Sequence, residues 1–159
     1  MNKIKNFDIY IVSLVLIIFD QIIKICIKLN IDKMPIDFFY GMLRLNYCEN
    51  EGAAFSIGNG NVLLFIIINV ILIIGLIIFY ERNKKNIKNL YKFFIILILS
   101  GGVSNLLDRI FRGYVIDFID VNKIIKFAVF NIADIFIVVG VIGIMFEIMK
   151  SNIIEGEKK

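Results

Sequence analysis

Residues 127–149, FAVFNIADIFIVVGVIGIMFEIM, form an apolar stretch long enough to cross a membrane as a helix, with a carboxylate near its start, Asp134. An ionisable side chain in such a segment costs at least about 2.5 kcal/mol on insertion scales, so it is expected to face a protein interior or a functional cavity. A second carboxylate, Asp117, precedes this stretch in GYVIDFID. These two acids are the first candidates for chemistry.

The composition indicates an integral membrane protein. Of the 159 residues, 59% are hydrophobic, whereas soluble domains average about 45–50%. The net charge of +4 comes from Lys and Arg that cluster in short segments between apolar runs, so it indicates membrane topology and no nucleic-acid partner. The basic N-terminal segment lacks a small-residue cleavage site and is expected to remain as a membrane anchor.

The inventory of reactive side chains restricts the possible chemistry. The chain has no His and two Cys, which excludes Ser–His and Cys–His catalysis and the usual zinc ligand sets. Carboxylates must therefore carry any acid–base step, and we expect no cofactor and no metal.

Four apolar runs approach the roughly 20 residues that a helix needs to span the hydrocarbon core. We predict an all-α membrane protein with four transmembrane helices, forming a single integral-membrane domain over residues 1–159. The predicted spans are Ile9–Leu29, Val62–Tyr80, Leu90–Leu107 and Phe127–Met149.

The distribution of basic residues predicts the orientation. The segment Glu81–Lys92 holds five basic residues and one acid, whereas the longer Asn30–Asn61 holds two basic residues and four acids. Cytoplasmic loops retain more Lys and Arg, so both termini are predicted to be cytoplasmic. The Asn30–Asn61 loop and the Asp108–Lys126 connection then lie outside, and residues Met42–Tyr47 alternate as a strand does, which predicts a small extracytoplasmic β-sheet in the first outer loop.

Polar residues recur on the predicted helices at the spacing of one helix face. Asp108 and Arg109 follow Asn105 by three and four residues, and Lys24 follows Asp20 by four on the first span. We interpret Asp108–Arg109 and Asp20–Lys24 as supporting ion pairs, while polar contacts that only join helices remain an alternative for the asparagines.

The predicted topology brings Asp117 and Asp134 to the same membrane face. Two nearby carboxylates cannot both ionise, so one would act as acid and the other as base, as in aspartic proteases. From spacing alone, a proton or ion pathway in a small proton-coupled carrier and a purely structural role stay open.

Five patches resemble the lipoprotein signal peptidases, also called signal peptidase II, in order and spacing. They are DQIIK at 20–24, NEGAAFS at 50–56, GGVSNLLDR at 101–109, GYVIDF at 113–118 and FNIAD at 130–134. The chain departs from the family pattern at Ser104, where Gly is usual, a small-for-small change.

The resemblance implies a bacterial plasma-membrane aspartic endopeptidase that hydrolyses the amide bond before the diacylglyceryl-modified cysteine of a prolipoprotein. It implies that Asp117 and Asp134 are the catalytic pair, at the extracytoplasmic interface. The expected partners are the prolipoprotein and membrane lipid, and the expected state is a monomer. The residues implied to support the site or the substrate are Asp20, Lys24, Asn50, Gly52, Ala54, Asn105, Asp108, Arg109, Asn131 and Ala133.

Overall fold

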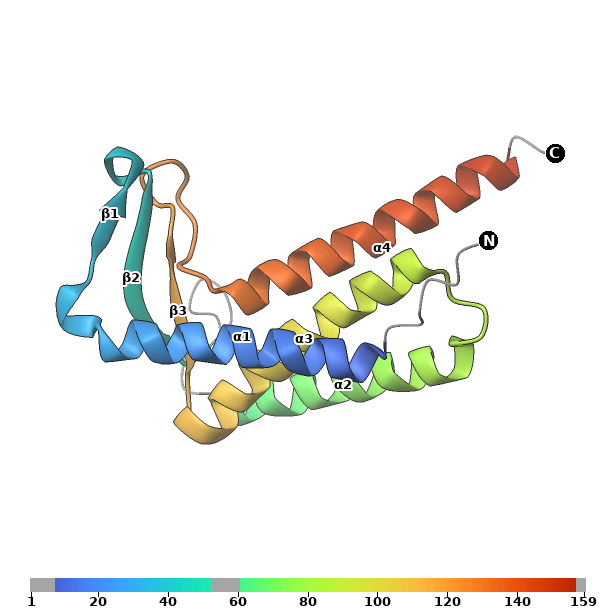
Figure 1. Ribbon diagram of the computed structural model, residues 1–159, viewed down its shortest axis with the longest axis horizontal. Helices are drawn as coiled ribbons and strands as arrows, with labels where there is room; N and C mark the ends of the chain where they lie inside the picture. The colour runs from blue at the N-terminus through green and yellow to red at the C-terminus, as the bar shows by residue number, and fades with distance from the viewer. Residues whose placement is uncertain (1–7, 53–60, 157–159) are drawn as a thin grey trace.

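The computed structural model describes residues 8–52 and 61–156, with side chains to residue 150 (Figure 1). Its helices are α1 (Ile9–Leu29), α2 (Val62–Asn83), α3 (Asn89–Arg112) and α4 (Ile132–Gly156). Its strands are β1 (Ile36–Phe38), β2 (Leu43–Asn50) and β3 (Val115–Asp120), with two short 3₁₀ turns, η1 (Ile31–Lys33) and η2 (Phe39–Gly41).

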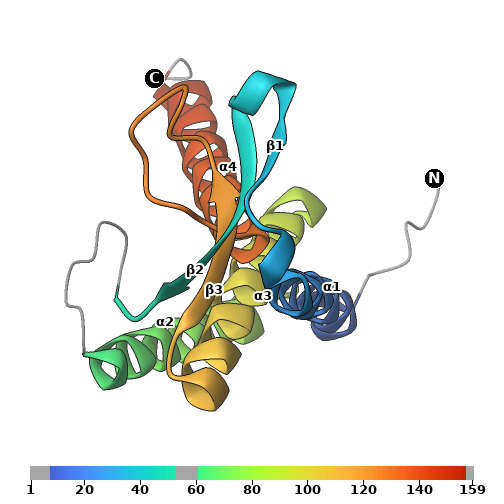
Figure 2. The same ribbon diagram turned by 90° about the vertical axis from the view of Figure 1, so that its left-hand side faces the viewer.

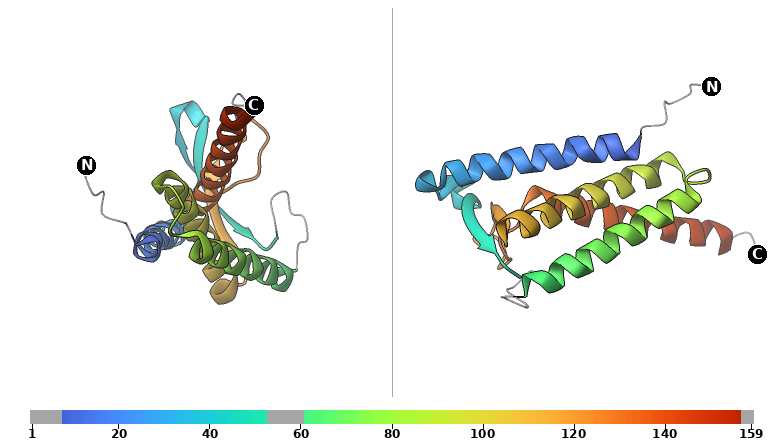
Figure 3. Two further views of the ribbon diagram at one scale, coloured as in Figure 1. Left: turned by 90° about the vertical axis from the view of Figure 1, so that its right-hand side faces the viewer. Right: turned by 90° about the horizontal axis from the view of Figure 1, so that it is seen from below.

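The four helices run lengthwise as a bundle, and α3 packs against each of the other three (Figure 3). All four are long and apolar enough to cross a membrane, which confirms the prediction of four spans. The start of α1 and the end of α4 lie at one end of the bundle, and the sheet lies at the other (Figure 1).

Burial in this bundle is reversed relative to a soluble protein. Asp20, Lys24 and Asp108 are fully buried, whereas α2 residues such as Leu63 and Ile71 are 70% and 63% exposed. Apolar side chains on the outside are stable when lipid surrounds them, while charged groups avoid lipid by pairing inside the protein.

The sheet is antiparallel, in the order β1-β2-β3, and crosses the end of the bundle opposite the start of α1 and the end of α4 (Figure 2). Arg44 pairs with Asp120 and Cys48 with Asp117, with an irregularity between Leu45 and Cys48. The predicted small sheet is confirmed, but its third strand comes from the connection after α3 and carries Asp117. Gly113, with φ of 81°, ends α3 in the left-handed conformation that glycine tolerates and turns the chain into β3.

The last helix begins five residues later than its predicted start, at Ile132 instead of Phe127. Phe130 forms a bridge with Ile119 of β3, donating to its carbonyl at 3.1 Å, so this part of the chain extends the sheet. Asn131 then starts the helix, because its Oδ1 accepts from the Asp134 N–H at 2.9 Å and its own N–H donates to Asp134 Oδ2 at 3.1 Å. This reciprocal arrangement is a capping box.

Candidate active site

A cavity of about 450 Å³ lies between β3, the chain before α4, and α4 itself. At one end of the cavity the lining is polar, and elsewhere it is apolar. The polar lining consists of Asn50, Asn105, Arg109, Asp117 and Asp134. The apolar wall includes Phe127, Val129, Ile135, Val138 and Val139.

Asp117 occupies β3 and is 2% exposed, with both carboxylate oxygens bonded to amides. Asn50 Nδ2 donates to Oδ2 at 2.8 Å, and Asn131 Nδ2 donates to Oδ1 at 2.7 Å. Burial, and next the charge of Asp134, raise the pKa of Asp117 from 3.8 to about 7, against the opposing effect of the two amides. At neutral pH this carboxyl group therefore holds a proton in a large fraction of molecules.

Asp134 lies in the first turn of α4 and lines the same cavity. Asn105 Nδ2 of α3 donates to its Oδ1 at 2.7 Å, while the Asn131 N–H reaches its Oδ2. Asn131 thus contacts both acids, through its side chain for Asp117 and through its backbone for Asp134. The capping box and the third strand bring the two carboxyl groups to one site from segments that are separated in sequence.

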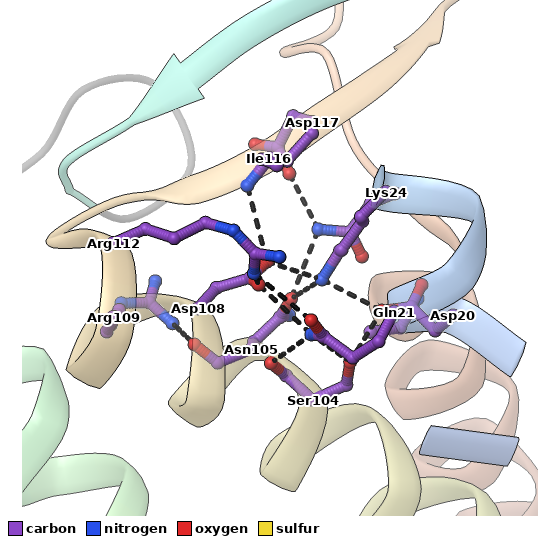
Figure 4. Close-up of polar contacts among 12 residues, drawn as sticks. Asp20, Gln21, Lys24, Ser104, Asn105, Asp108, Arg109, Arg112, Ile116 and Asp117 are labelled. Carbon is purple, nitrogen blue, oxygen red and sulfur yellow. Dashed lines mark hydrogen bonds and ion pairs between the residues drawn. The ribbon is translucent and has the colours of Figure 1, made fainter. Parts of the chain in front are cut away.

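A network of buried charges lies near Asp117 (Figure 4). Lys24 Nζ forms ion pairs with Asp20 Oδ2 at 2.9 Å and Asp108 Oδ2 at 2.8 Å, and donates to Asn105 Oδ1 at 2.9 Å. All three charged groups are fully buried, so each depends on the others for compensation of its lost hydration. The predicted pair Asp20–Lys24 is confirmed by these contacts.

Asp20 also fixes the start of α4 against α1. Its Oδ1 accepts from the Ala133 N–H at 3.0 Å, and its Oδ2 accepts from Ser104 Oγ at 2.6 Å. Gly101 of α3 lies so close to this turn that an added Cβ would come within 2.2 Å of the Ala133 carbonyl oxygen. The Ser104 hydroxyl group thus joins α3 to Asp20 of α1.

Arg109 is not the partner of Asp108 that we predicted from their adjacency. Asp108 pairs with Lys24 and Arg112, because the direction of its side chain on α3 takes it toward α1. Arg109 instead donates to the carbonyls of Gly52 at 3.1 Å and Asn105 at 3.3 Å. Its Nε is buried without a hydrogen-bond partner in the described part of the chain, and the residue lines the cavity.

The remaining candidates are placed only in part. Gly52 donates its N–H to Asn50 Oδ1 at 3.0 Å, so both functional groups of Asn50 are engaged, with Gly52 and Asp117. Ala54 lies outside the described residues. Among residues 8–52 and 61–156, no group of three or more His, Cys, Asp or Glu side chains has an arrangement that could hold a metal ion.

Two residues of the network were missed in the sequence. Gln21 Nε2 donates to Ser104 Oγ at 3.0 Å and to Asp108 Oδ1 at 3.0 Å, and Arg112 donates to Gln21 Oε1 at 3.1 Å and to Asp108. Arg112 could have been found, since it follows Asp108 by four residues on one helix. Gln21 could not have been found from residue spacing, because its contacts join α1 to α3, which are far apart in the sequence.

Four membrane-length helices and a partly apolar cavity that contains two carboxyl groups define a multi-pass membrane protein with an acidic site. Residues 12–150 match the family model described as signal peptidase (SPase) II. The chain therefore belongs to the signal peptidase II family of membrane peptidases.

Relatives and solved structures agree with this assignment. The chain is 41% identical over 135 residues to a lipoprotein signal peptidase of Caldicellulosiruptor bescii, covering 85% of this chain and 86% of the relative. It is 35% identical over 145 residues to the lipoprotein signal peptidase of Streptococcus pyogenes serotype M1, covering 90% and 94%. A bacterial membrane enzyme solved by the in meso method at 2.3 Å resolution matches with a TM-score of 0.82 and 30% identity, over 93% of this chain and 91% of that one. The resemblance noted in the five patches is thus confirmed.

Proposed function

We propose that this protein removes the signal peptide from prolipoproteins by hydrolysing the amide bond before a diacylglyceryl-modified cysteine, with Asp117 and Asp134 as the catalytic pair. Membership of the signal peptidase II family supports the reaction. The observation that carries the assignment of the pair is Asn131, which contacts both carboxyl groups within one cavity. Amide hydrolysis needs an acid and a base at the same bond, and two carboxyl groups that share one proton supply both.

The raised pKa of Asp117, about 7, suggests how the roles divide. Protonated Asp117 donates a hydrogen bond to the scissile carbonyl oxygen, while ionised Asp134 accepts a proton from the attacking water. The water oxygen bonds to the carbonyl carbon to give a tetrahedral intermediate. The carbon–nitrogen bond then breaks, and the proton held by Asp134 passes to the leaving amine, which is the amino group of the modified cysteine.

The two halves of the cavity lining suit a substrate that is both peptide and lipid. The wall formed by Val138, Val139 and Phe127 offers apolar surface for acyl chains beside the polar end. The Arg109 Nε donor, buried without a partner among the described residues, would be satisfied by a carbonyl oxygen of the substrate. Asn50 is engaged with Asp117, so we assign it to orienting that carboxyl group before substrate contact.

The proposed orientation places the reaction at the outer face of a bacterial plasma membrane, with both termini cytoplasmic. The five basic residues of Glu81–Lys92 support this assignment, since that segment joins α2 to α3 at the end of the bundle opposite the sheet. Both carboxyl groups and their amide partners come from one chain, which supports a monomer as the working unit.

The test is cleavage of a lipidated precursor by purified protein in lipid vesicles, with an unlipidated precursor as the substrate control. Asp117→Asn and Asp134→Asn should each reduce cleavage at least about a thousandfold, since each removes a group that must hold or release a proton. The matched control is Asp32→Asn, because Asp32 is exposed in η1 and should be dispensable.

Near-normal cleavage by either variant would refute the assignment of the pair. The same vesicles, loaded with a pH-sensitive dye, test the carrier alternative. Proton flux that depends on Asp134, without any cleavage of precursor, would refute the peptidase function itself.

A further inference from the structure

Five large apolar side chains are exposed in η2 and in the connection between β3 and α4. Phe39 and Tyr40 in η2 are 72% and 95% exposed, and Ile124, Ile125 and Phe127 in the β3–α4 connection are 64%, 60% and 44% exposed. We call these five residues the outer patch. Large apolar groups that gather outside a core mark a surface with a partner.

The two segments of the outer patch lie at the same end of the sheet (Figure 1). Arg44, just after η2, pairs with Asp120, just before the connection. Lys123 joins the segments directly, because its ammonium group donates to the Tyr40 carbonyl oxygen. The outer patch is therefore one surface built from two parts of the chain.

The backbone of η2 holds its aromatic side chains in an unfavourable conformation. Phe39 and Tyr40 have φ of 48° and 57°, in the left-handed region that bulky residues rarely adopt. Such strain persists where the surrounding structure imposes it and frequently accompanies a function. Here the conformation keeps two rings exposed, which water alone would disfavour.

We infer that the outer patch lies in the interfacial region of the outer leaflet, where it holds the sheet against the membrane. Phe127 of the outer patch lines the cavity together with Val138 and Val139 of the membrane-length helix α4, which are 54% and 45% exposed, so the patch adjoins exposed apolar side chains of that helix. Exposed Lys126 lies beside the apolar residues, where its ammonium group can reach lipid phosphates. Aromatic rings and lysines favour this depth of a bilayer.

This contact has a consequence for the site. Phe127 and Val129 belong to the chain between the outer patch and Asn131, and they form part of the cavity wall. Lipid contact at Ile124 and Ile125 therefore fixes the segment that separates the cavity from the outer leaflet. The inference depends on the four membrane spans and is independent of the peptidase reaction.

The chain has no tryptophan, so single Trp substitutions report their own depth. Phe39→Trp and Ile125→Trp are placed in vesicles whose lipids carry bromine either near the glycerol or near the acyl-chain end. Ile71→Trp, in the middle of α2 and exposed, is the deep control. Asp32→Trp, in η1, is the aqueous control.

Both outer-patch probes should be quenched by the shallow bromines, about twofold or more above the deep bromines, with the reverse for Ile71→Trp. Quenching no greater than that of Asp32→Trp would overturn the inference. Quenching that appears only when precursor is added would also overturn it, because the surface would then bind substrate. Protection of the probes from bromine quenching that grows with protein density would overturn it as well, because the surface would then contact a second copy. Because the two probes lie in different segments, the test remains valid if one of the two variants misfolds.

Discussion

At the scale of single residues, the orientation of amide side chains decides how the carboxylate pair is held. Lys24 has only donors, so the Asn105 oxygen must face it, and this leaves the Asn105 amide nitrogen directed at Asp134. Asn131 follows the same logic, since its amide nitrogen donates to Asn105 Oδ1 at 3.1 Å as well as to Asp117. Lys24 thus acts on the site through Asn105 without touching either member of the pair.

Lys24→Met should lower the free energy of unfolding by about 3–5 kcal/mol, because Asp20 and Asp108 would remain buried without their shared cation. Unfolding in detergent by heat or denaturant measures this. The control is Lys33→Met, since Lys33 is exposed and bonds to Asn30 in its own turn. A loss below about 1 kcal/mol would mean that the network does not depend on Lys24.

The pKa of Asp117 predicts a pH dependence. As pH rises through about 7, the group loses its proton and the pair becomes doubly charged, so cleavage should decline on the alkaline side by up to about tenfold per pH unit. The free energy of unfolding should also fall as pH rises. Because the pKa of Asp117 in the folded protein lies above the unfolded value of 3.8, the contribution of this group to stability is complete at low pH and is lost as pH rises toward 7. A profile of kcat/KM and an unfolding series over pH 4–9 check both.

Asn50→Ala tests the cause of that profile. The amide of Asn50 lowers the pKa of Asp117 by donating to the carboxylate, so its removal should move the alkaline decline to higher pH. A lower overall rate with an unmoved pH profile would show that Asn50 acts elsewhere, for example on the substrate.

At the scale of elements, hydropathy predicts the four helices but not where the last one begins. The apolar residues from Phe127 onward are compatible with either a transmembrane helix or an extended segment beside the sheet. The bridge between Phe130 and Ile119 shows that Phe130 is extended. The signal for the true start was present in Asn131-Ile-Ala-Asp134, an N-cap followed three residues later by an acid. Strand β3 was missed because VIDFID is short, carries Asp117 and Asp120, and has its pairing partners, β2 and Phe130, elsewhere in the sequence.

The site was also predictable only in part. Topology places Asp117 and Asp134 on one membrane face, and the shared cavity agrees with that expectation. The spacing of Asp20 and Lys24 predicts their ion pair, because residues four apart lie one turn apart on the same face of a helix. The partners of Asp108 were not predictable from spacing, because whether it faces Lys24 or Arg109 depends on how α3 is rotated against α1.

The packing of α3 against α4 gives a prediction with an internal control. Gly101→Ala should destabilise the protein by about 1–3 kcal/mol and reduce cleavage, because the new Cβ would push the first turn of α4, with Asp134, away from α3. Gly75→Ala makes the same change in α2, where nothing lies within 4 Å, and should be neutral or stabilising by up to about 1 kcal/mol. Equal effects of the two variants on melting temperature would contradict this account of the helix contact.

At the scale of the whole molecule, charge is segregated along the bundle axis. The sheet and carboxylate pair lie at one end, and the connection between α2 and α3, with Lys84, Lys85 and Lys88, lies at the other (Figure 1). The buried ion pairs of Lys24 belong to the end with the sheet. This polarity predicts a single orientation in the membrane.

Thiol labelling in intact cells tests that orientation. In a background with Cys26→Ser and Cys48→Ser, Asp32→Cys in η1 should react with a membrane-impermeant maleimide, whereas Lys85→Cys should react only after the membrane is permeabilised. The physical reason is that five basic residues in Glu81–Lys92 oppose translocation, while Asn30–Asn61 has four acids against two basic residues. Labelling of Lys85→Cys in intact cells would reverse the orientation and put the carboxylate pair at the cytoplasmic face, where the proposed cleavage of exported precursors could not occur.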